Sequence, residues 1–429
     1  MRAFPLLFIA ALLLPPVSLG QAGTGDAAKL ESVQVTGSAR FRSEQVAAAI
    51  GLHPGAMVTR DDLQKAANDL AQLGVFSSVQ YRYTSLDTGV RAEYQVKDLP
   101  GVLVSFDNFP WFSDDQLIAA IQKSGALFDG NAPTGGTVLD AISGALEKLI
   151  ASRGVFSRVS HVMTTAALSG AQTEQFHVEQ SDVKVAAVDF SDAVAQNDHA
   201  IHTRLTDVVG QPYSRALIDI FEVEQVRPVY LAHAFLHVRF VAPICRFPEG
   251  VTGAAAKNAT VVVGIEPGPA FVWGGVSWSG NSAISTLDLQ QFIPLHQGDA
   301  ADGTKIEAGW ESVRTAYRHL GYLDADVKPV GRLDDSTRQA TYTGAISEGP
   351  RYRMGKLILT GLSVEGERRI RAAWKIAPGA VFDDDIFQEF LSHGITQAFA
   401  GLPVHYDKIG HFLQTNPATA TVDVLMDFQ

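Results

Sequence analysis

A six-residue sequence that occurs twice constrains the fold more than any other feature of the chain. Gly74-Val-Phe-Ser-Ser-Val reappears 80 residues later as Gly154-Val-Phe-Ser-Arg-Val. Each copy follows a segment whose apolar residues recur at helical spacing, and a glycine there is a common helix stop. Valine and phenylalanine after the stop favour a strand. This repetition predicts tandem copies of one small unit and not a single large domain.

The first copy shows the complete order of elements. Residues 33–37 alternate in polarity and end in glycine, which predicts a strand. Ser43 is expected to cap a first helix, Pro54 and Gly55 to form a turn, and Thr59 to cap a second helix. The second helix presents one apolar face, formed by Leu63, Ala66, Ala67, Leu70 and Leu73. Two alternating strands follow Gly74, so the predicted unit is β-α-α-β-β.

The same order recurs to the end of the sequence, with one divergent copy. In the third copy Ala234 stands where the helix-stopping glycine is expected, and no glycine follows the first strand at Phe190. Pro-Gly or Gly-Pro pairs separate the later copies. We expect a signal peptide at 1–22, a linker at 23–29, and units at 30–98, 99–181, 182–267 (the divergent copy), 268–349 and 350–429.

The first residues predict export. Arg2 precedes an apolar run over residues 4–14, two prolines break the run, and small residues follow up to Ala22. The run is too short for a membrane helix, which needs about 18 residues, and it favours a cleaved signal peptide. A retained N-terminal anchor is the alternative. No cysteine follows the run, so a lipid anchor at that site is excluded.

Composition limits how the units are stabilised and what they bind. Cys245 is the single cysteine, so no internal disulfide can form and each unit must rely on an apolar core. The formal net charge of −12 argues against nucleic acid as a partner, because nucleic-acid binding needs a basic surface.

Candidate catalytic or metal-binding residues are few. His233 and His237 have the spacing of two zinc ligands on a helix, but no glutamate accompanies them, and a turn is expected between them by alignment to Gly321. Cys245, in apolar surroundings, is interpreted as an unreactive thiol. Two further polar groups are interpreted as loop or helix-capping residues: His199 and His202 with Asp192 and Asp198, and Asp383 to Asp385.

Motifs for catalysis are also missing from the sequence. It contains neither a Gly-x-Ser-x-Gly elbow nor a phosphate-binding Gly-x-x-x-x-Gly-Lys loop. We therefore predict no catalytic residue, no cofactor, no metal and no small-molecule substrate, and the chain is not expected to be an enzyme.

The ordered, repeated unit resembles the polypeptide-transport-associated (POTRA) domain. Arrays of such domains form the periplasmic part of BamA-like outer-membrane assembly proteins and of two-partner secretion transporters. The resemblance implies an α+β fold in which two helices cover one face of a three-stranded mixed sheet. It also implies a periplasmic location, either soluble or docked on the outer membrane. The family's C-terminal barrel is not expected here, because the fifth unit extends to Gln429.

The resemblance also suggests where partners bind. The second strand of each unit is expected at a sheet edge, around 77–83 and 157–163, where an extended segment can add through main-chain hydrogen bonds. The candidate residues are Val79, Tyr81, Val159 and His161. The expected partners are unfolded outer-membrane protein clients or an outer-membrane barrel protein. A structural adaptor with one fixed envelope partner, or an exported hydrolase, are the alternatives.

Overall fold

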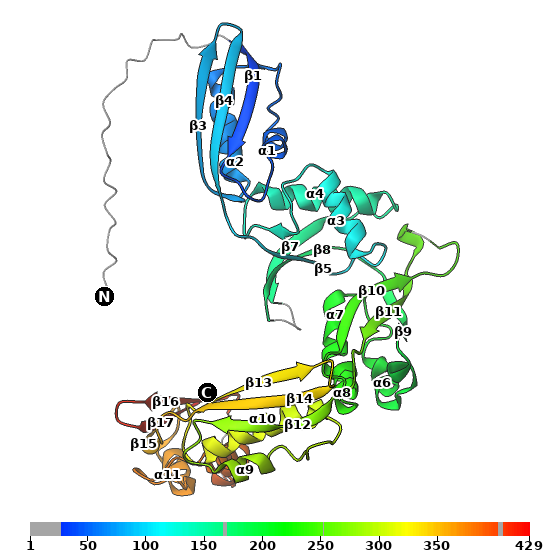
Figure 1. Cartoon of the computed structure of the whole chain (residues 1–429). Coiled ribbons are helices and arrows are strands. Elements are labelled where there is room, and N and C mark those ends of the chain that lie inside the picture. Colours follow the sequence, from blue (N-terminus) through cyan, green and yellow to red (C-terminus); the bar gives the residue numbers. More distant parts are fainter. Residues whose placement is uncertain (1–26, 166–169, 252, 402–405) are drawn as a thin grey trace, which may run out of the picture. The chain divides into compact units, whose positions relative to one another are not determined.

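The computed structural model describes residues 27–165, 170–251, 253–401 and 406–429, and within them five small sheets follow one another along the chain (Figure 1). In each sheet the strand that comes last in the sequence lies between the first strand, to which it is parallel, and the strand just before it in the sequence, to which it is antiparallel. The predicted signal peptide lies outside the described residues.

The strands, sheet by sheet, have the following bounds. The first sheet contains β1 (Ala28–Thr36), β2 (Met57–Val58), β3 (Phe76–Leu86) and β4 (Gly89–Asp98), and the second contains β5 (Val102–Phe106), β6 (Asn131–Ala132), β7 (Val159–Thr165) and β8 (Gln172–Val178). The other three are β9 (Lys184–Phe190), β10 (Arg239–Arg246) and β11 (Asn258–Glu266), then β12 (Val272–Ser279), β13 (Asp326–Asp334) and β14 (Gln339–Ser347), then β15 (Arg353–Thr360), β16 (Ile409–Asn416) and β17 (Thr421–Phe428).

Along the chain, the helices lie between the first strand of each sheet and its last two strands. The first, second and fourth sheets each have two, namely α1 (Ser43–Ala49) and α2 (Arg60–Gln72), α3 (Asp114–Lys123) and α4 (Thr137–Ala151), and α9 (Thr286–Gln291) and α10 (Gly303–His319). The third sheet has α5 (Ala193–Asn197), α6 (His199–Arg204), α7 (Arg215–Phe221) and α8 (Arg227–Ala232), with a π-helical turn at Glu222–Val226. The fifth has α11 (Val364–Ala373), α12 (Asp384–Glu389) and α13 (Ile395–Ala398), with a π-helical turn at Phe390–Gly394. The predicted α+β fold is confirmed.

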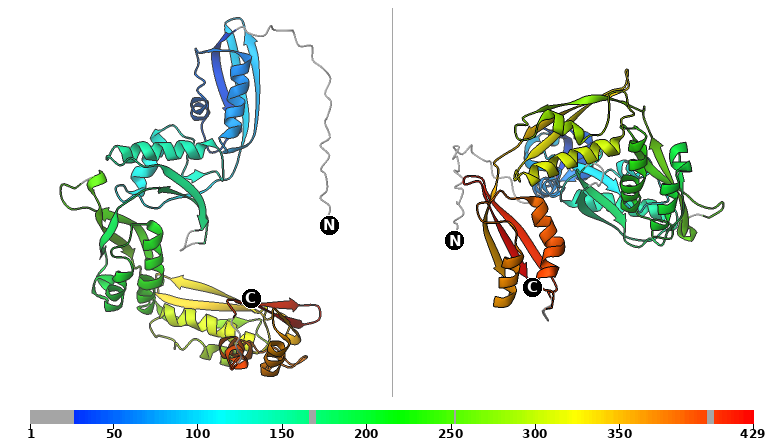
Figure 2. Two further views of the ribbon diagram at one scale, coloured as in Figure 1. Left: turned by 180° about the vertical axis from the view of Figure 1, so that it is seen from behind. Right: turned by 90° about the horizontal axis from the view of Figure 1, so that it is seen from below.

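The described residues divide into two compact units, residues 27–183 with 248–257, and residues 184–247 with 258–429. Within the second, α9 and α10 lie along one face of the sheet formed by β12, β14 and β13 (Figure 2). We propose that each of the five sheets, with its helices, is one domain of the tandem array.

The core of the first domain forms where the apolar face of α2 meets the sheet. Leu63 and Leu70 are buried against alternating residues of β4, among them Tyr94. The Tyr94 hydroxyl donates to the Leu63 carbonyl over 3.0 Å, so the polar end of this buried ring is satisfied. Burial of apolar area at about 25 cal/mol per Å² is the main stabilising contribution, since no disulfide is present.

Two sequence predictions about helix starts had different outcomes. Thr59 caps α2, accepting a hydrogen bond from the Asp62 N–H, as predicted. Ser43 does not cap α1, because Arg42 is the N-cap and the Ser43 hydroxyl accepts instead from the Val35 N–H over 2.8 Å. The hydroxyl therefore ties the first strand to the first helix.

The six-residue repeat is only partly equivalent in space. Val75 and Val155 are both buried, but Phe76 is 5% exposed and starts β3, whereas Phe156 is 86% exposed. The expected strand after Gly154 begins only at Val159. Identical residues thus adopt different roles because the second domain turns before its strand begins.

A residue in the left-handed conformation follows the last helix of each domain. Its φ is +85° at Gly74 and +89° at Gly321. Ala234, in the divergent copy, has φ +64° although alanine rarely adopts this conformation. The carbonyl of Ala234 accepts the Phe271 N–H over 2.9 Å, and that of Gly321 accepts the Tyr352 N–H over 2.7 Å. In the second compact unit this residue therefore joins one domain to the first strand of the next.

In the first compact unit the residue at this position, Gly74, makes a close backbone contact with the next domain. Gly74 lies against Gly135 and Gly136, which precede α4, and a Cβ at Gly74 would overlap the Gly135 carbonyl oxygen. The Val138 side chain joins the first core across this contact. Arg40 also binds Asp129 with two hydrogen bonds of 2.8 Å, which lowers the pKa of the Asp129 carboxyl below its ordinary value.

Gly74→Ala is expected to destabilise the first compact unit by more than about 3 kcal/mol, because left-handed strain of about 1–2 kcal/mol adds to the steric overlap. Gly154→Ala is the matched control. Gly154 has φ +74°, and no described atom lies within 4 Å of its added Cβ. Gly154→Ala should therefore lower the free energy of unfolding only by about the left-handed strain of 1–2 kcal/mol. Urea unfolding of both variants measures the difference, and equal losses would contradict the close contact.

Candidate functional site

The four candidate residues lie on two strands at sheet edges. Val79 and Tyr81 are on β3, the last strand of the order β2-β1-β4-β3, and Val159 and His161 are on β7, the last of β6-β5-β8-β7. Among the described residues no further strand pairs with the outer side of β3 or β7. An edge of this kind presents unpaired main-chain donors and acceptors.

The hydrogen bonds of β7 show which residues face outward. The Glu179 N–H donates to the carbonyl of Arg158, its direct partner, over 2.9 Å. Because hydrogen-bonded and non-hydrogen-bonded pairs alternate in an antiparallel ladder, the main chain of Val159, His161 and Met163 faces away from β8. These residues carry the donors and acceptors that an added strand would use.

Val159 is a poorer candidate than His161. Its N–H donates to the Glu147 Oε1 of α4 over 3.0 Å. This carboxylate closes the start of the edge, so an incoming strand would have to displace it. The open part of β7 therefore begins at His161.

Val79 and Tyr81 direct their side chains toward the helices. Val79 packs against the first core, and the Tyr81 ring stacks on Tyr94 with 5.8 Å between centroids. The Tyr81 hydroxyl donates to the Gln64 side chain over 3.1 Å. Both side chains are therefore already engaged within the first domain.

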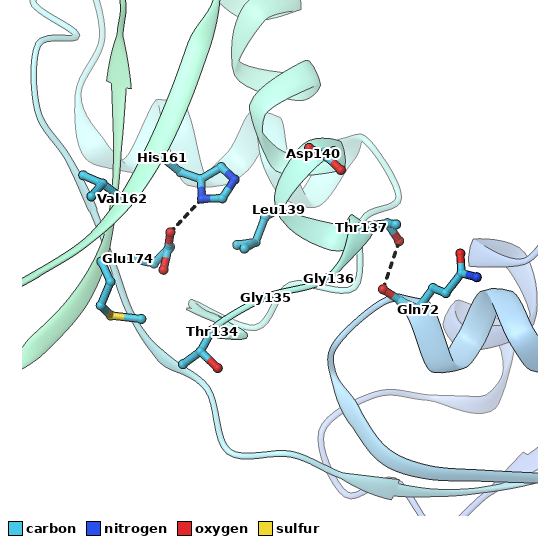
Figure 3. Close-up of a pocket in the computed structure, with 11 residues that line it drawn as sticks. Gln72, Thr134, Gly135, Gly136, Thr137, Leu139, Asp140, His161, Val162 and Glu174 are labelled. Atoms are coloured by element: carbon cyan, nitrogen blue, oxygen red, sulfur yellow. Dashed lines mark hydrogen bonds and ion pairs between the residues drawn. The ribbon is translucent and has the colours of Figure 1, made fainter.

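A cavity of about 600 Å³ opens beside the outward-facing part of β7 (Figure 3). His161 and Met163 of β7 and Glu174 of β8 line one side, and the Thr134–Thr137 segment with Gln72 lines the other. Glu174 is 3% exposed and its Oε1 lies 2.7 Å from His161 Nδ1, so the imidazole holds the buried carboxylate in place. No local pattern in the sequence points to Glu174, since its contact with His161 depends on the pairing of β7 with β8.

The edges of the third and fourth domains differ from those of β3 and β7. Pro243 lies within β10 and Pro329 within β13, and both are edge strands of their sheets. Proline has no N–H, so it interrupts any ladder formed on that side. The Arg314 guanidinium also donates to the Val327 carbonyl of β13 over 3.2 Å. The prolines were visible in the sequence, and strand proline is the signal that could have separated these edges from the others.

The remaining candidate residues have structural contacts. The turn predicted between His233 and His237 is confirmed by the left-handed Ala234. His233 Nδ1 lies 2.8 Å from the Val229 carbonyl, and His237 Nδ1 lies 3.3 Å from Asp335. No group of three or more His, Cys, Asp or Glu residues suited to a metal occurs in the part of the chain that the structure describes.

Two other predicted roles concern Asp383 and Cys245. Asp383 caps α12 by accepting from the Asp385 and Ile386 N–H groups, as predicted. Burial raises the pKa of the Cys245 thiol to about 12, so the thiol is protonated at neutral pH and is a weak nucleophile.

One buried carboxyl stands out in the third domain. Glu222, at the start of the π-helical turn, is 1% exposed, and its Oε1 has no hydrogen-bond partner in the described structure. Burial, together with the nearby Asp219, raises the pKa of the Glu222 carboxyl to about 8. The group is therefore largely protonated at neutral pH.

The fold is an array of small α+β modules, each with a strand at the edge of its sheet. A family model for the POTRA domain, described as "Surface antigen variable number repeat", matches residues 28–98 and 271–349. These two segments, the first and fourth domains, are POTRA domains, and the other three sheets have the same strand order.

The relatives by sequence and structure are distant. A protein of Treponema pallidum (strain Nichols), "Putative outer membrane protein assembly factor", is 23% identical over 166 residues, which cover 39% of this chain and 20% of that protein. The match thus spans about a fifth of the relative's length. POTRA domains 3–5 of Haemophilus influenzae BamA are 15% identical, with 58% of this chain and 96% of that chain covered and a TM-score of 0.45. The N-terminal domain of Omp85 from Thermosynechococcus elongatus is 12% identical, with 94% of this chain and 97% of that chain covered and a TM-score of 0.21. Helices in the described ranges are all too short or too polar to span a membrane.

The third domain should lose stability as pH rises. The pKa of Glu222 is higher in the folded state than in the unfolded chain, so its contribution is complete below about pH 4 and is lost as pH rises through about 8. Between pH 6 and 9 we expect Glu222→Gln to gain about 2–3 kcal/mol over the wild type, measured by urea unfolding. Glu224→Gln, an exposed carboxyl in the same turn, is the control and should show no such gain. A pH-independent difference for Glu222→Gln would contradict the buried-carboxyl argument.

Proposed function

We propose that this chain is a periplasmic scaffold in outer-membrane protein assembly or secretion, which binds extended polypeptide by adding it to open sheet edges. The observation that carries the proposal is the outward-facing main chain of β7 from His161 onward. Main-chain pairing is tolerant of side-chain sequence, which suits a protein with many clients. The POTRA match and the name of the Treponema relative support the assembly role.

The five edges are not equivalent in this proposal. β3, β7 and β16 contain no proline, whereas β10 and β13 contain Pro243 and Pro329. Clients would therefore add to the first, second and fifth domains, and the third and fourth would act as spacers. The role is one of binding and not of catalysis.

A fixed adaptor is the rival proposal, and the range of partners separates the two. Cross-linking in intact envelopes followed by affinity capture of the tagged full chain gives the test. Nascent outer-membrane proteins together with a barrel protein would support the scaffold. One stoichiometric partner, with no unfolded clients, would replace it with the adaptor.

His161→Pro is expected to weaken binding of an extended, alternating peptide to the full chain by about tenfold, because it removes an outward N–H and strains the added ladder. His161→Ala removes the side chain but keeps the N–H, and should retain main-chain binding. Fluorescence anisotropy with a labelled peptide measures both, and circular dichroism checks folding. Equal affinities for the two variants would exclude β7 as the binding edge.

Removing a proline offers the converse test. Pro329→Val restores an N–H to β13 and should create a further binding edge, seen as a higher peptide stoichiometry at saturation. An unchanged stoichiometry, with a folded variant, would show that proline is not what closes this edge.

A further inference from the structure

We propose that the cavity beside β7 selects polypeptide segments that carry a lysine or arginine, by receiving the cationic side chain against Glu174 and Asp140. This inference rests on the proposed strand addition at β7 and specifies which segments bind there best. It concerns the cavity of Figure 3, which lies within the first compact unit.

The position of the cavity relates it to the strand edge. His161 and Met163 line the cavity with their side chains, and the main chain of the same two residues faces the open edge. A strand added to β7 would lie about 4.8 Å from it, with alternate side chains on the face where His161 lies. One of these side chains would enter the cavity.

The charge of the cavity favours a cation. Its lining contains two carboxylates, Glu174 and Asp140, and neither lysine nor arginine. Glu174 is held by His161, and one of its two oxygens makes that contact, so the carboxylate can accept a further donor. A cationic donor to a shielded carboxylate makes a stronger hydrogen bond than a neutral donor does.

The start of α4 contributes a partial positive charge to the cavity, which opposes cation binding. Gly136 and Thr137 line the cavity where α4 begins, and a helix N-terminus carries about half a positive charge, which favours anions. Asp140 lies in the first turn of this helix and offsets that partial charge. The lining thus holds two carboxylates, against the partial charge of the helix start and the His161 imidazole that contacts Glu174.

The size of the cavity agrees with a long side chain. Its volume of about 600 Å³ exceeds what one side chain fills, and Leu139 and Met163 supply apolar surface for a lysine or arginine stem. The charged end would then reach the carboxylates, while the stem packs on these two residues.

Three labelled ten-residue peptides of alternating pattern test the inference, with lysine, leucine or glutamate at one central position. The full chain should bind the lysine peptide about tenfold more tightly than the leucine peptide, and the glutamate peptide most weakly. Glu174→Gln should reduce the preference for lysine over leucine to less than about threefold. Asp140→Asn, at an exposed position, should reduce it in part and tests the inference if Glu174→Gln fails to fold.

Glu179→Gln is the matched control, because Glu179 is exposed on the same domain and does not line the cavity. It should preserve the lysine preference, which excludes a general effect of net charge. Equal affinities of the wild type for the lysine and leucine peptides would overturn the cavity's role while leaving strand addition intact. If no peptide binds, or if His161→Pro leaves all three affinities unchanged, strand addition at β7 itself fails, and the selectivity falls with it.

Discussion

The left-handed residue after the last helix of each domain is the constraint on which this array depends. Its φ lies between +64° and +89° in all five domains, at Gly74, Gly154, Ala234, Gly321 and Gly401. The reversal turns the chain from the helix toward the second strand. In the second compact unit the same residue also accepts a main-chain hydrogen bond from the start of the next domain. One backbone conformation thus sets both the fold of a domain and its link to the next.

The domains share one sheet topology but differ in the residues that cover their edge strands. The helix position seven residues before the stop holds Glu147 in the second domain and Arg314 in the fourth, and each side chain binds the main chain at the start of the neighbouring edge strand. Pro243 and Pro329 add a second kind of closure in the third and fourth domains. Such devices are a general means of preventing uncontrolled strand pairing. Their distribution is uneven, since β3, β7 and β16 contain no proline.

Three carboxyl groups of the chain, those of Asp129, Glu174 and Glu222, differ in burial and in the donors that contact them. Arg40 and Asp129 make a bidentate pair between the first two domains, and Glu174 is held by His161. Glu222 is buried near Asp219, and its Oε1 has no hydrogen-bond partner among the described residues, so the pKa of its carboxyl rises to about 8. The cost of desolvating a carboxylate grows with its burial, and a donor that contacts the carboxylate offsets that cost.

The sequence by itself determined the repeated β-α-α-β-β order, the α+β class and the turn at Ala234, because helix stops and apolar periodicity are local signals. It could not place Ser43, whose hydroxyl binds Val35 and does not cap its own helix. Nor could it distinguish the buried Phe76 from the exposed Phe156 within the same motif. Tertiary structure alone brought Glu147 to Val159, and Glu174 to His161 beside a cavity. These contacts join residues 12 and 13 positions apart through strand register and helix packing, which no local pattern specifies.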